Sequence, residues 1–205
     1  AAMDTQQRLA DLIAAYDSNV EGREERGEPD WRNLIRADFA ERIPSGGTVL
    51  EIGAGVGFTS QWFDIHGFDV TATDLSPGNV EKIREKGVTA EVRDMAHLGF
   101  SPGSFDGVWG ASCLMHIPDA ELPEVLVGIA EVIRPGGWFW SGTWGGHDQE
   151  GTWEDDWYEP KRFYSLRTDE RMRAFYEASF EVVSFEYFEP EPEIDWGYQS
   201  ALMRR

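Results

Sequence analysis

The sequence predicts a doubly wound α/β fold, with a mostly parallel seven-stranded sheet that ends in an antiparallel strand pair. Between residues 48 and 143, short apolar runs alternate with helical segments, which implies parallel strands joined by right-handed crossovers. A glycine-rich turn follows the first run, where ligands bind in open α/β sheets. Two final strand-like runs are joined by a link too short for a parallel crossover, so they should pair antiparallel. The 205 residues are expected to form one domain.

The first 47 residues are expected to form two helices that cap the domain. One face of the first helix carries apolar residues at offsets of three, four and seven: Leu9, Leu12, Ile13 and Tyr16. Pro29-Asp30 should open the second helix. Its apolar face comprises Trp31, Leu34, Ile35, Phe39 and Ile43. The charged residues 22–28 between the two helices are expected to be a linker.

Residues 48–143 carry the alternation that should form the core. Strands are expected at 48–52, 69–73, 88–92, 105–109 and 138–143. Helices are expected at 58–66, at 77–86 and at about 122–133, the last closed by Pro135-Gly136-Gly137. The crossover at 93–104 is too short for a full helix, so an irregular turn is expected there.

Residues 168–205 should form a helix at 168–178 and strands at 180–188 and 194–202. Residues 144–167 precede this unit and include the stretch HDQEGTWEDDWYEPKRFYSL. This insert is too polar for a core and too aromatic for a spacer. We therefore expect a lid loop over a ligand pocket.

The charge of the chain argues against several partners. It has 38 acidic and 18 basic residues and a formal net charge of -20, which disfavours nucleic acid. No apolar stretch approaches the roughly 20 residues of a membrane span, and no secretory signal is visible. Cys113 is the only cysteine, which excludes an internal disulfide and fits a reducing cytoplasm. The oligomeric state, monomer or homodimer, stays open.

The glycine-rich turn raises the question of which nucleotide it would bind. Gly53, Gly55 and Gly57 have the spacing G-x-G-x-G, whereas a dinucleotide fingerprint has G-x-G-x-x-G. Glu51 lies two residues before the first glycine, where a carboxylate favours a cationic ligand over a pyrophosphate. The pattern therefore favours S-adenosylmethionine over NAD; a glycine-rich turn without a ligand is the alternative.

Two acids follow the next two strands. Asp74 can accept hydrogen bonds from both hydroxyls of a ribose, or it could cap the next helix, a role that Ser76 before Pro77 fits well. Asp94 can accept from the exocyclic amino group of an adenine, next to the backbone N–H of Met95. Its alternative is an ordinary solvated loop acid.

Five segments in order resemble the motifs of class I S-adenosylmethionine-dependent methyltransferases: VLEIGAGVG, TATDLSP, VRDM, FDGVWGASCLMHI and IRPGGWF. The resemblance covers Thr48 to Thr143 and implies a Rossmann-like fold, with S-adenosylmethionine as cofactor and S-adenosylhomocysteine as product. The cofactor site that it implies comprises Tyr16, Glu51, Gly53, Ala54, Gly55, Gly57, Asp74, Leu75, Asp94, Met95, Ala111, Cys113 and His116. Tyr16 could equally be a core-facing aromatic residue.

The resemblance implies transfer of a methyl group to an O, N or C atom of a small-molecule acceptor. Such a transfer is an in-line displacement that mainly requires an aligned nucleophile. His116 after the fourth strand or His147 after the fifth could act as a base. His116 could instead be part of the pocket wall, and His147 a loop residue. Cys113 has no neighbouring motif that would activate its thiol.

Acceptor specificity is expected from the insert. Trp153, Trp157 and Tyr158 could contact an aromatic acceptor, and Arg162 could hold an acceptor carboxylate. Residues 154–156 are acidic and could attract a cationic acceptor. The alternative is an acidic surface loop anchored by its aromatic side chains.

Three other functions are kept beside this one. The chain could be a catalytically silent S-adenosylmethionine-binding regulatory protein, or a methyltransferase acting on protein or RNA. An NAD-dependent oxidoreductase is disfavoured by the glycine spacing and by the missing catalytic signature. No metal is expected.

Overall fold

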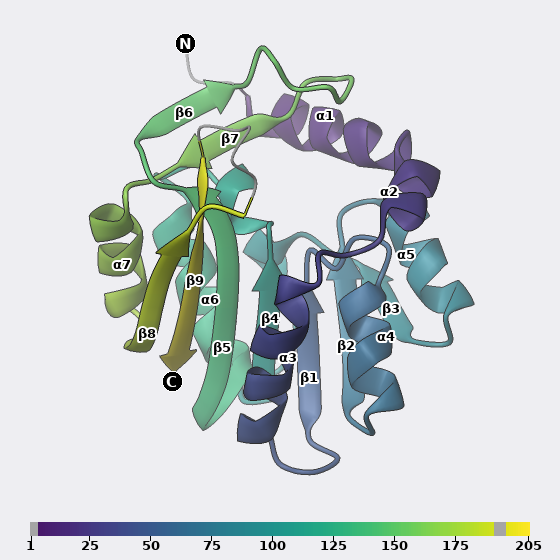
Figure 1. Cartoon of the computed structure of the whole chain (residues 1–205), viewed down its shortest axis with the longest axis vertical. Coiled ribbons are helices and arrows are strands. Elements are labelled where there is room, and N and C mark those ends of the chain that lie inside the picture. Colours follow the sequence, from purple (N-terminus) through teal and green to yellow (C-terminus); the bar gives the residue numbers. More distant parts are fainter. Residues whose placement is uncertain (1–3, 191–195) are drawn as a thin grey trace.

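Seven strands form one sheet in the order β3-β2-β1-β4-β5-β9-β8, in a computed structural model that describes residues 4–190 and 196–205 (Figure 1). Their bounds are β1 Thr48–Ile52, β2 Asp69–Asp74, β3 Thr89–Val92, β4 Phe105–Ala111, β5 Ile133–Gly145, β8 Glu181–Phe188 and β9 Gly197–Arg204. Strands β1 to β5 run parallel, and β9 pairs antiparallel with both β5 and β8. The predicted fold class is confirmed.

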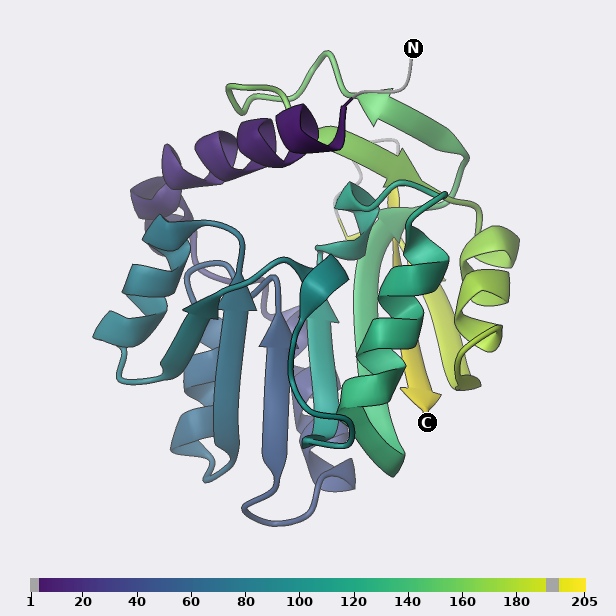
Figure 2. The ribbon, with the colours of Figure 1, turned by 180° about the vertical axis from the view of Figure 1, so that it is seen from behind.

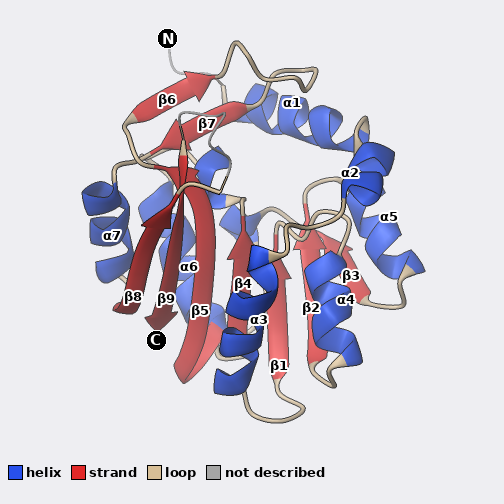
Figure 3. Cartoon of the chain, viewed as in Figure 1, coloured by secondary structure: helices blue, strands red, loops and turns tan. Residues whose placement is uncertain are grey.

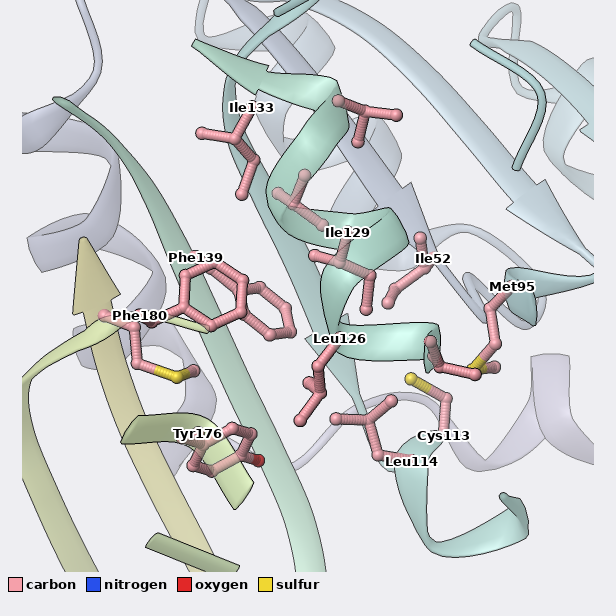
Figure 4. Packing of buried hydrophobic residues seen from close by; sticks show 14 of the residues in the cluster. Ile52, Met95, Cys113, Leu114, Leu126, Ile129, Ile133, Phe139, Tyr176 and Phe180 are labelled. Atoms are coloured by element: carbon pink, nitrogen blue, oxygen red, sulfur yellow. The ribbon is translucent and has the colours of Figure 1, made fainter. Parts of the chain in front are cut away.

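Helices cover both faces of the sheet (Figure 3). They are α3 Trp31–Arg42, α4 Phe58–Ile65, α5 Pro77–Glu85, α6 Leu122–Val132 and α7 Asp169–Glu177. On one face, side chains of α3, α4 and α5, among them Phe39 and Phe63, pack against Trp109 of β4. On the other face, Leu126 and Ile129 of α6 share a cluster with Phe139 of β5 (Figure 4).

The N-terminal region differs from the prediction in three ways. Residues 22–28 are largely helical, in α2 Val20–Arg26, because Glu24 pairs with Lys86 of α5 at 2.8 Å and holds the charged segment against the domain. The predicted second cap helix, α3, instead packs on a face of the sheet, whereas α1 Thr5–Asp17 and α2 lie at its end. Leu34, expected on the apolar face of α3, is 80% exposed.

Strand β5 is longer than predicted because the Pro-Gly-Gly segment lies inside it. Phe105 pairs with Ile133 and Gly107 with Trp138, so five residues of β5 match two of β4 across a bulge. Pro135, which has no backbone N–H, is accommodated in that bulge. At its other end β5 reaches Gly145, and β4 continues to Ala111.

The insert is a β-hairpin rather than a loop. Strands β6 Gln149–Thr152 and β7 Phe163–Leu166 pair antiparallel, and with α1 they lie beyond the carboxyl ends of the parallel strands (Figures 1 and 2). The irregular turn at 93–104 is confirmed and contains the 3₁₀ helix η1 Met95–His97; a second, η2 Leu114–His116, follows β4. Of the strand expected at 194–202, residues 194 and 195 lie outside the described residues. Among the described helices, none is long and apolar enough to cross a membrane.

Candidate functional site

Two adjoining cavities lie at the carboxyl ends of the parallel strands. The first, which we call the narrow cleft, has a volume of about 50 Å³ and is walled by α1, α2 and the loops after β1, β2, β3 and β4. The second, the wide cavity, has a volume of about 360 Å³ and extends from α2 and α3 to the hairpin. The walls they share are made of Tyr16, Arg23, Gly53, Ala111 and Ser112.

The structure brings most predicted site residues together. Ten of the predicted cofactor residues line the narrow cleft: Tyr16, Gly53, Gly55, Asp74, Leu75, Asp94, Met95, Ala111, Cys113 and His116. Two others, Glu51 and Ala54, line the wide cavity, as do all four predicted acceptor residues, Trp153, Trp157, Tyr158 and Arg162. Gly57 and His147 are the two predicted residues that belong to neither lining.

Glycine is required in the turn after β1 by backbone angle and by space. Gly53 and Gly55 have φ angles of +58° and +57°, in the left-handed region. A Cβ on Gly53 would lie 2.5 Å from Cβ of Cys113, and one on Gly55 would lie 2.8 Å from a guanidinium nitrogen of Arg23. Gly57 has another role: it caps α4, and a Cβ there would lie 2.6 Å from Ile83. The turn therefore leaves its backbone exposed to the narrow cleft.

Asp74 ends β2 and is held by backbone and side-chain donors. Its Oδ2 accepts from the N–H of Gly55 at 2.8 Å, and its Oδ1 accepts from Ser76 N at 2.9 Å and from Asn79 Nδ2 at 3.2 Å. Burial raises its pKa against the opposing effect of these bonds. A carboxylate offers about four acceptor positions, so one on Oδ2 stays open. The cap of α5 is Ser76, whose Oγ accepts from Asn79 N at 3.0 Å.

Two further acids differ in their surroundings. Asp94 lines the narrow cleft and caps η1, because its Oδ1 accepts from Ala96 N at 2.9 Å. Glu51 is buried at the end of β1 and accepts a hydrogen bond from Ser60. Burial raises the pKa of Glu51 to about 8, so it is largely protonated at neutral pH. Asp94 therefore lies in the lining of the narrow cleft, whereas Glu51 offers a mostly neutral carboxyl to the wide cavity.

A chain of hydrogen bonds connects α1, η2 and β7 at the junction of the cavities. Nδ1 of His116 lies 2.8 Å from the carbonyl oxygen of Phe163, which can only accept, so Nδ1 carries the proton. Nε2 of His116 then accepts from the hydroxyl of Tyr16 at 2.8 Å. That hydroxyl in turn accepts from Arg162 at 3.1 Å. The hydroxyl of Tyr16 thus donates to His116 and accepts from Arg162.

The surroundings of these hydrogen-bonded groups keep His116 neutral. Burial, together with the positive charge of Arg162, lowers the pKa of His116 to about 3. Burial also raises the pKa of Tyr16, although Arg162 and Arg23 oppose this. The pair therefore stays as neutral phenol and neutral imidazole at physiological pH. His147, by contrast, lies between β5 and β6 with its Nε2 3.3 Å from Gln149, outside both cavities.

Asp156 and Arg162 form a largely buried ion pair within the hairpin. Asp156 is 2% exposed and accepts from Nε and NH2 of Arg162 at 2.9 and 2.8 Å. The guanidinium of Arg162 also lies 3.5 Å above the ring of Tyr158. Arg162 thus lines the wide cavity while its guanidinium is paired with Asp156 and donates to Tyr16, and the carboxylate of Asp156 is paired within the hairpin. The roles expected of Arg162 and of the acidic residues 154–156 toward an acceptor stay predictions.

Sequence reasoning missed Arg23, which contributes to both linings. Its guanidinium lies above the turn at Gly55 and 5.2 Å from the ring centre of Tyr16. Its Nε is buried without a hydrogen-bond partner. Other residues missed in the linings include Arg8, Leu9, Leu12, Asn79 and Arg93 in the narrow cleft and Arg26, Glu28, Trp31, Arg32, Trp144, Tyr164 and Trp196 in the wide cavity.

Comparisons with known proteins agree with this geometry. A family model described as a methyltransferase domain matches residues 49–137. A 2-methyl-6-phytyl-1,4-hydroquinone methyltransferase of Synechocystis is 34% identical over 128 residues, 58% of this chain and 39% of that protein. A ubiquinone biosynthesis O-methyltransferase of Xylella fastidiosa is 34% identical over 115 residues, 51% of this chain and 46% of that protein. The chain thus spans less than half the length of these curated relatives.

One solved structure matches along the whole chain. It is the Burkholderia thailandensis 1,6-didemethyltoxoflavin-N1-methyltransferase with bound 1,6-didemethyltoxoflavin and S-adenosylhomocysteine. The match has a TM-score of 0.81 and 21% sequence identity, and it covers 100% of this chain and 92% of that one. At this identity the match supports the fold alone, including the helices and the hairpin beyond residues 49–137.

Proposed function

We propose that this chain, which a methyltransferase-domain model matches over residues 49–137, is a class I S-adenosylmethionine-dependent methyltransferase that transfers a methyl group to an O, N or C atom of a small molecule. The observation that carries this proposal is the wall shared by the two cavities. A methyl donor in the narrow cleft and an acceptor in the wide cavity would meet beside Tyr16 and Arg23. This arrangement provides the alignment that an in-line displacement requires.

Unpaired polar atoms in the narrow cleft fit an adenosine ligand. Asp74 has one open acceptor position on Oδ2, and the Oδ1 of Asn79 is buried without a partner. Together these two oxygens can accept hydrogen bonds from the two hydroxyls of a ribose. The role first expected of Asp74 alone is then divided between Asp74 and Asn79. Asp94 and the backbone of Met95 are placed to bind the adenine edge.

The amino-acid part of the cofactor would lie beside the glycine turn. The partnerless Nε of Arg23 supplies a cationic donor there, suited to the methionine carboxylate. The cleft of about 50 Å³ is small beside ligand pockets, which usually measure about 300–1,000 Å³. We therefore propose that Tyr16 and Arg23 move outward with α1 and α2 to admit the cofactor, and then close on it.

His116 is assigned a positioning role for Tyr16. An effective general base has a pKa near the working pH, whereas that of His116 is lowered to about 3. Its Nε2 lone pair is already occupied by the hydroxyl of Tyr16. His116 thus fixes the phenol at the junction. The sulfonium donor supplies the activated leaving group, and the protein contributes orientation and exclusion of water.

Two measurements test the proposal. Calorimetry with S-adenosylhomocysteine should show saturable binding that Asp74→Asn weakens, and transfer of a labelled methyl group to members of a metabolite panel should identify an acceptor. Absence of binding would refute the methyl-donor site. Binding without transfer to any small molecule, protein or RNA would instead favour the regulatory alternative.

A further inference from the structure

We propose that the acceptor is a planar aromatic compound with an acidic group, bound at the mouth of the wide cavity by Trp157 and Arg26. This inference rests on the proposed methyl transfer and names the acceptor class for the same site. It follows from the shape of the aromatic lining, from the charges that remain unpaired there, and from the stacking of Arg26 on Trp157.

Aromatic side chains from separate segments meet around the wide cavity. Trp153 and Tyr164 of the hairpin both contact Trp196 before β9, with ring centres 4.6 and 5.2 Å apart. Trp157 contacts Tyr158 with a centre-to-centre distance of 4.2 Å. Such surfaces offer flat, rigid faces on which another ring can stack. A planar ring therefore suits this lining.

The charges of the lining oppose the charge of the chain as a whole. Four arginines and two glutamates line the wide cavity, although the chain has a net charge of -20. Arg162 is paired with Asp156, and Arg32 is paired with Glu28 at 3.2 Å. The two other arginines, Arg23 and Arg26, have no carboxylate within salt-bridge distance in the described structure. Among the described residues of the lining, they leave an excess of positive charge.

Arg23 and Arg26 are exceptional among the basic residues that the structure describes. Every other lysine or arginine donates to a carboxylate or to a backbone carbonyl. Arg23 lies above the glycine turn and is assigned to the cofactor. Arg26 lines only the wide cavity, so its guanidinium is available to the acceptor.

Arg26 and Trp157 together form a recognition element for an aromatic acid. The guanidinium carbon of Arg26 lies 4.6 Å from the ring centre of Trp157, and Trp157 is 57% exposed. A second ring can stack on the open part of Trp157 while its carboxylate accepts from Arg26. A cationic amine would meet the guanidinium instead and be repelled.

Three naphthalene probes with one ring system and different charges test this proposal. 2-Naphthoate, 2-naphthalenemethanol and 2-naphthylmethylammonium are titrated by calorimetry into the full chain saturated with S-adenosylhomocysteine. We expect 2-naphthoate to bind about tenfold more tightly than the ammonium probe, because only the carboxylate can accept a charge-assisted hydrogen bond from Arg26. Equal or tighter binding of the ammonium probe would overturn the proposal.

Variants then assign the preference to its residues. Arg26→Gln should lower the affinity for 2-naphthoate about tenfold and leave that for 2-naphthalenemethanol within about twofold, whereas Arg26→Lys should retain most of the preference. Arg42→Gln is the matched control, because Arg42 also ends a helix and lies 5.1 Å from the ring centre of a tryptophan, Trp138, and neither residue belongs to the cavity lining. An equal loss for all three probes in Arg26→Gln would refute the role of its charge.

Trp157→Ala completes the set, since loss of the stacking face should weaken all three probes together. If S-adenosylhomocysteine binds and no naphthalene probe does, the aromatic-acid proposal fails while the methyl-donor site stands. If S-adenosylhomocysteine itself does not bind, the proposed function fails, and titration of the probes alone still decides whether the cavity prefers an aromatic anion.

Discussion

The buried carboxyl of Glu51 makes the stability of this fold depend on pH, and replacement by glutamine should remove that dependence. Glu51 is 4% exposed at the end of β1 and accepts a hydrogen bond from Ser60. Burial raises its pKa from 4.5 to about 8, although the bond from Ser60 opposes the change. Glu51→Gln retains an acceptor for Ser60 and has no proton to release.

The sign and size of the effect follow from where the proton resides. Between pH 4.5 and about 8 the folded chain holds the Glu51 proton that the unfolded chain has released, so the free energy of unfolding falls as pH rises. One pKa unit corresponds to about 1.36 kcal/mol, and the shift from 4.5 to about 8 therefore costs the wild type about 5 kcal/mol above pH 8. Below pH 4.5 both states hold the proton and the cost vanishes.

Urea unfolding followed by tryptophan fluorescence, at several pH values between about 5 and 8, measures this difference. The stability of Glu51→Gln should exceed that of the wild type by an amount that grows with pH by several kcal/mol. Glu177→Gln, in which the replaced side chain is 51% exposed, controls for the loss of one acidic residue. A difference between Glu51→Gln and the wild type that stays constant over this range would show that Glu51 is already ionised in the folded chain, and would refute the reasoning.

Three other substitutions test the site. Asp74→Asn should weaken S-adenosylmethionine binding about tenfold or more, because the amide presents a donor where Gly55 already donates; unchanged affinity by calorimetry would remove Asp74 from the cofactor site. Burial and Arg162 lower the pKa of His116 to about 3, so the pH profile of kcat/KM should have the same shape near pH 6.5 in the wild type and in His116→Gln. An ionisation near pH 6.5 that is present in the wild type and lost in His116→Gln would mean that the imidazole is free to act as a base. Asp156→Asn should lower stability by about 3–5 kcal/mol because it leaves Arg162 buried without its carboxylate, and a melting temperature equal to that of the wild type would contradict this.

Most of the narrow cleft could be predicted because strand ends of a parallel sheet converge. Gly55, Asp74 and Asp94 lie at or just after the end of a strand, so their proximity follows from topology without knowledge of side-chain packing. Gly57 has the same local sequence signal, yet its missing Cβ serves packing against Ile83. A glycine pattern alone cannot distinguish these two uses.

Residues outside the sheet were less predictable. Arg23 was hidden because α2 is highly charged and has no clear apolar stripe; it is held by ion pairs to α5, which a linear sequence does not reveal. Asp156 has the sequence appearance of a surface acid and is buried because Arg162, six residues later, returns to it across the hairpin. Leu34 shows the reverse, an apolar residue at helical spacing that faces solvent.

The wall that the two cavities share also determines how their ligands influence each other. Tyr16 and Arg23 contribute to both linings, so a ligand that immobilises these side chains from one cavity leaves less ordering to be done by a ligand in the other. Donor and acceptor should therefore bind cooperatively, and the factor by which one tightens the other must be the same in both directions. Release of one product would then lower the affinity for the second, so the rate of turnover would depend on Tyr16 and Arg23.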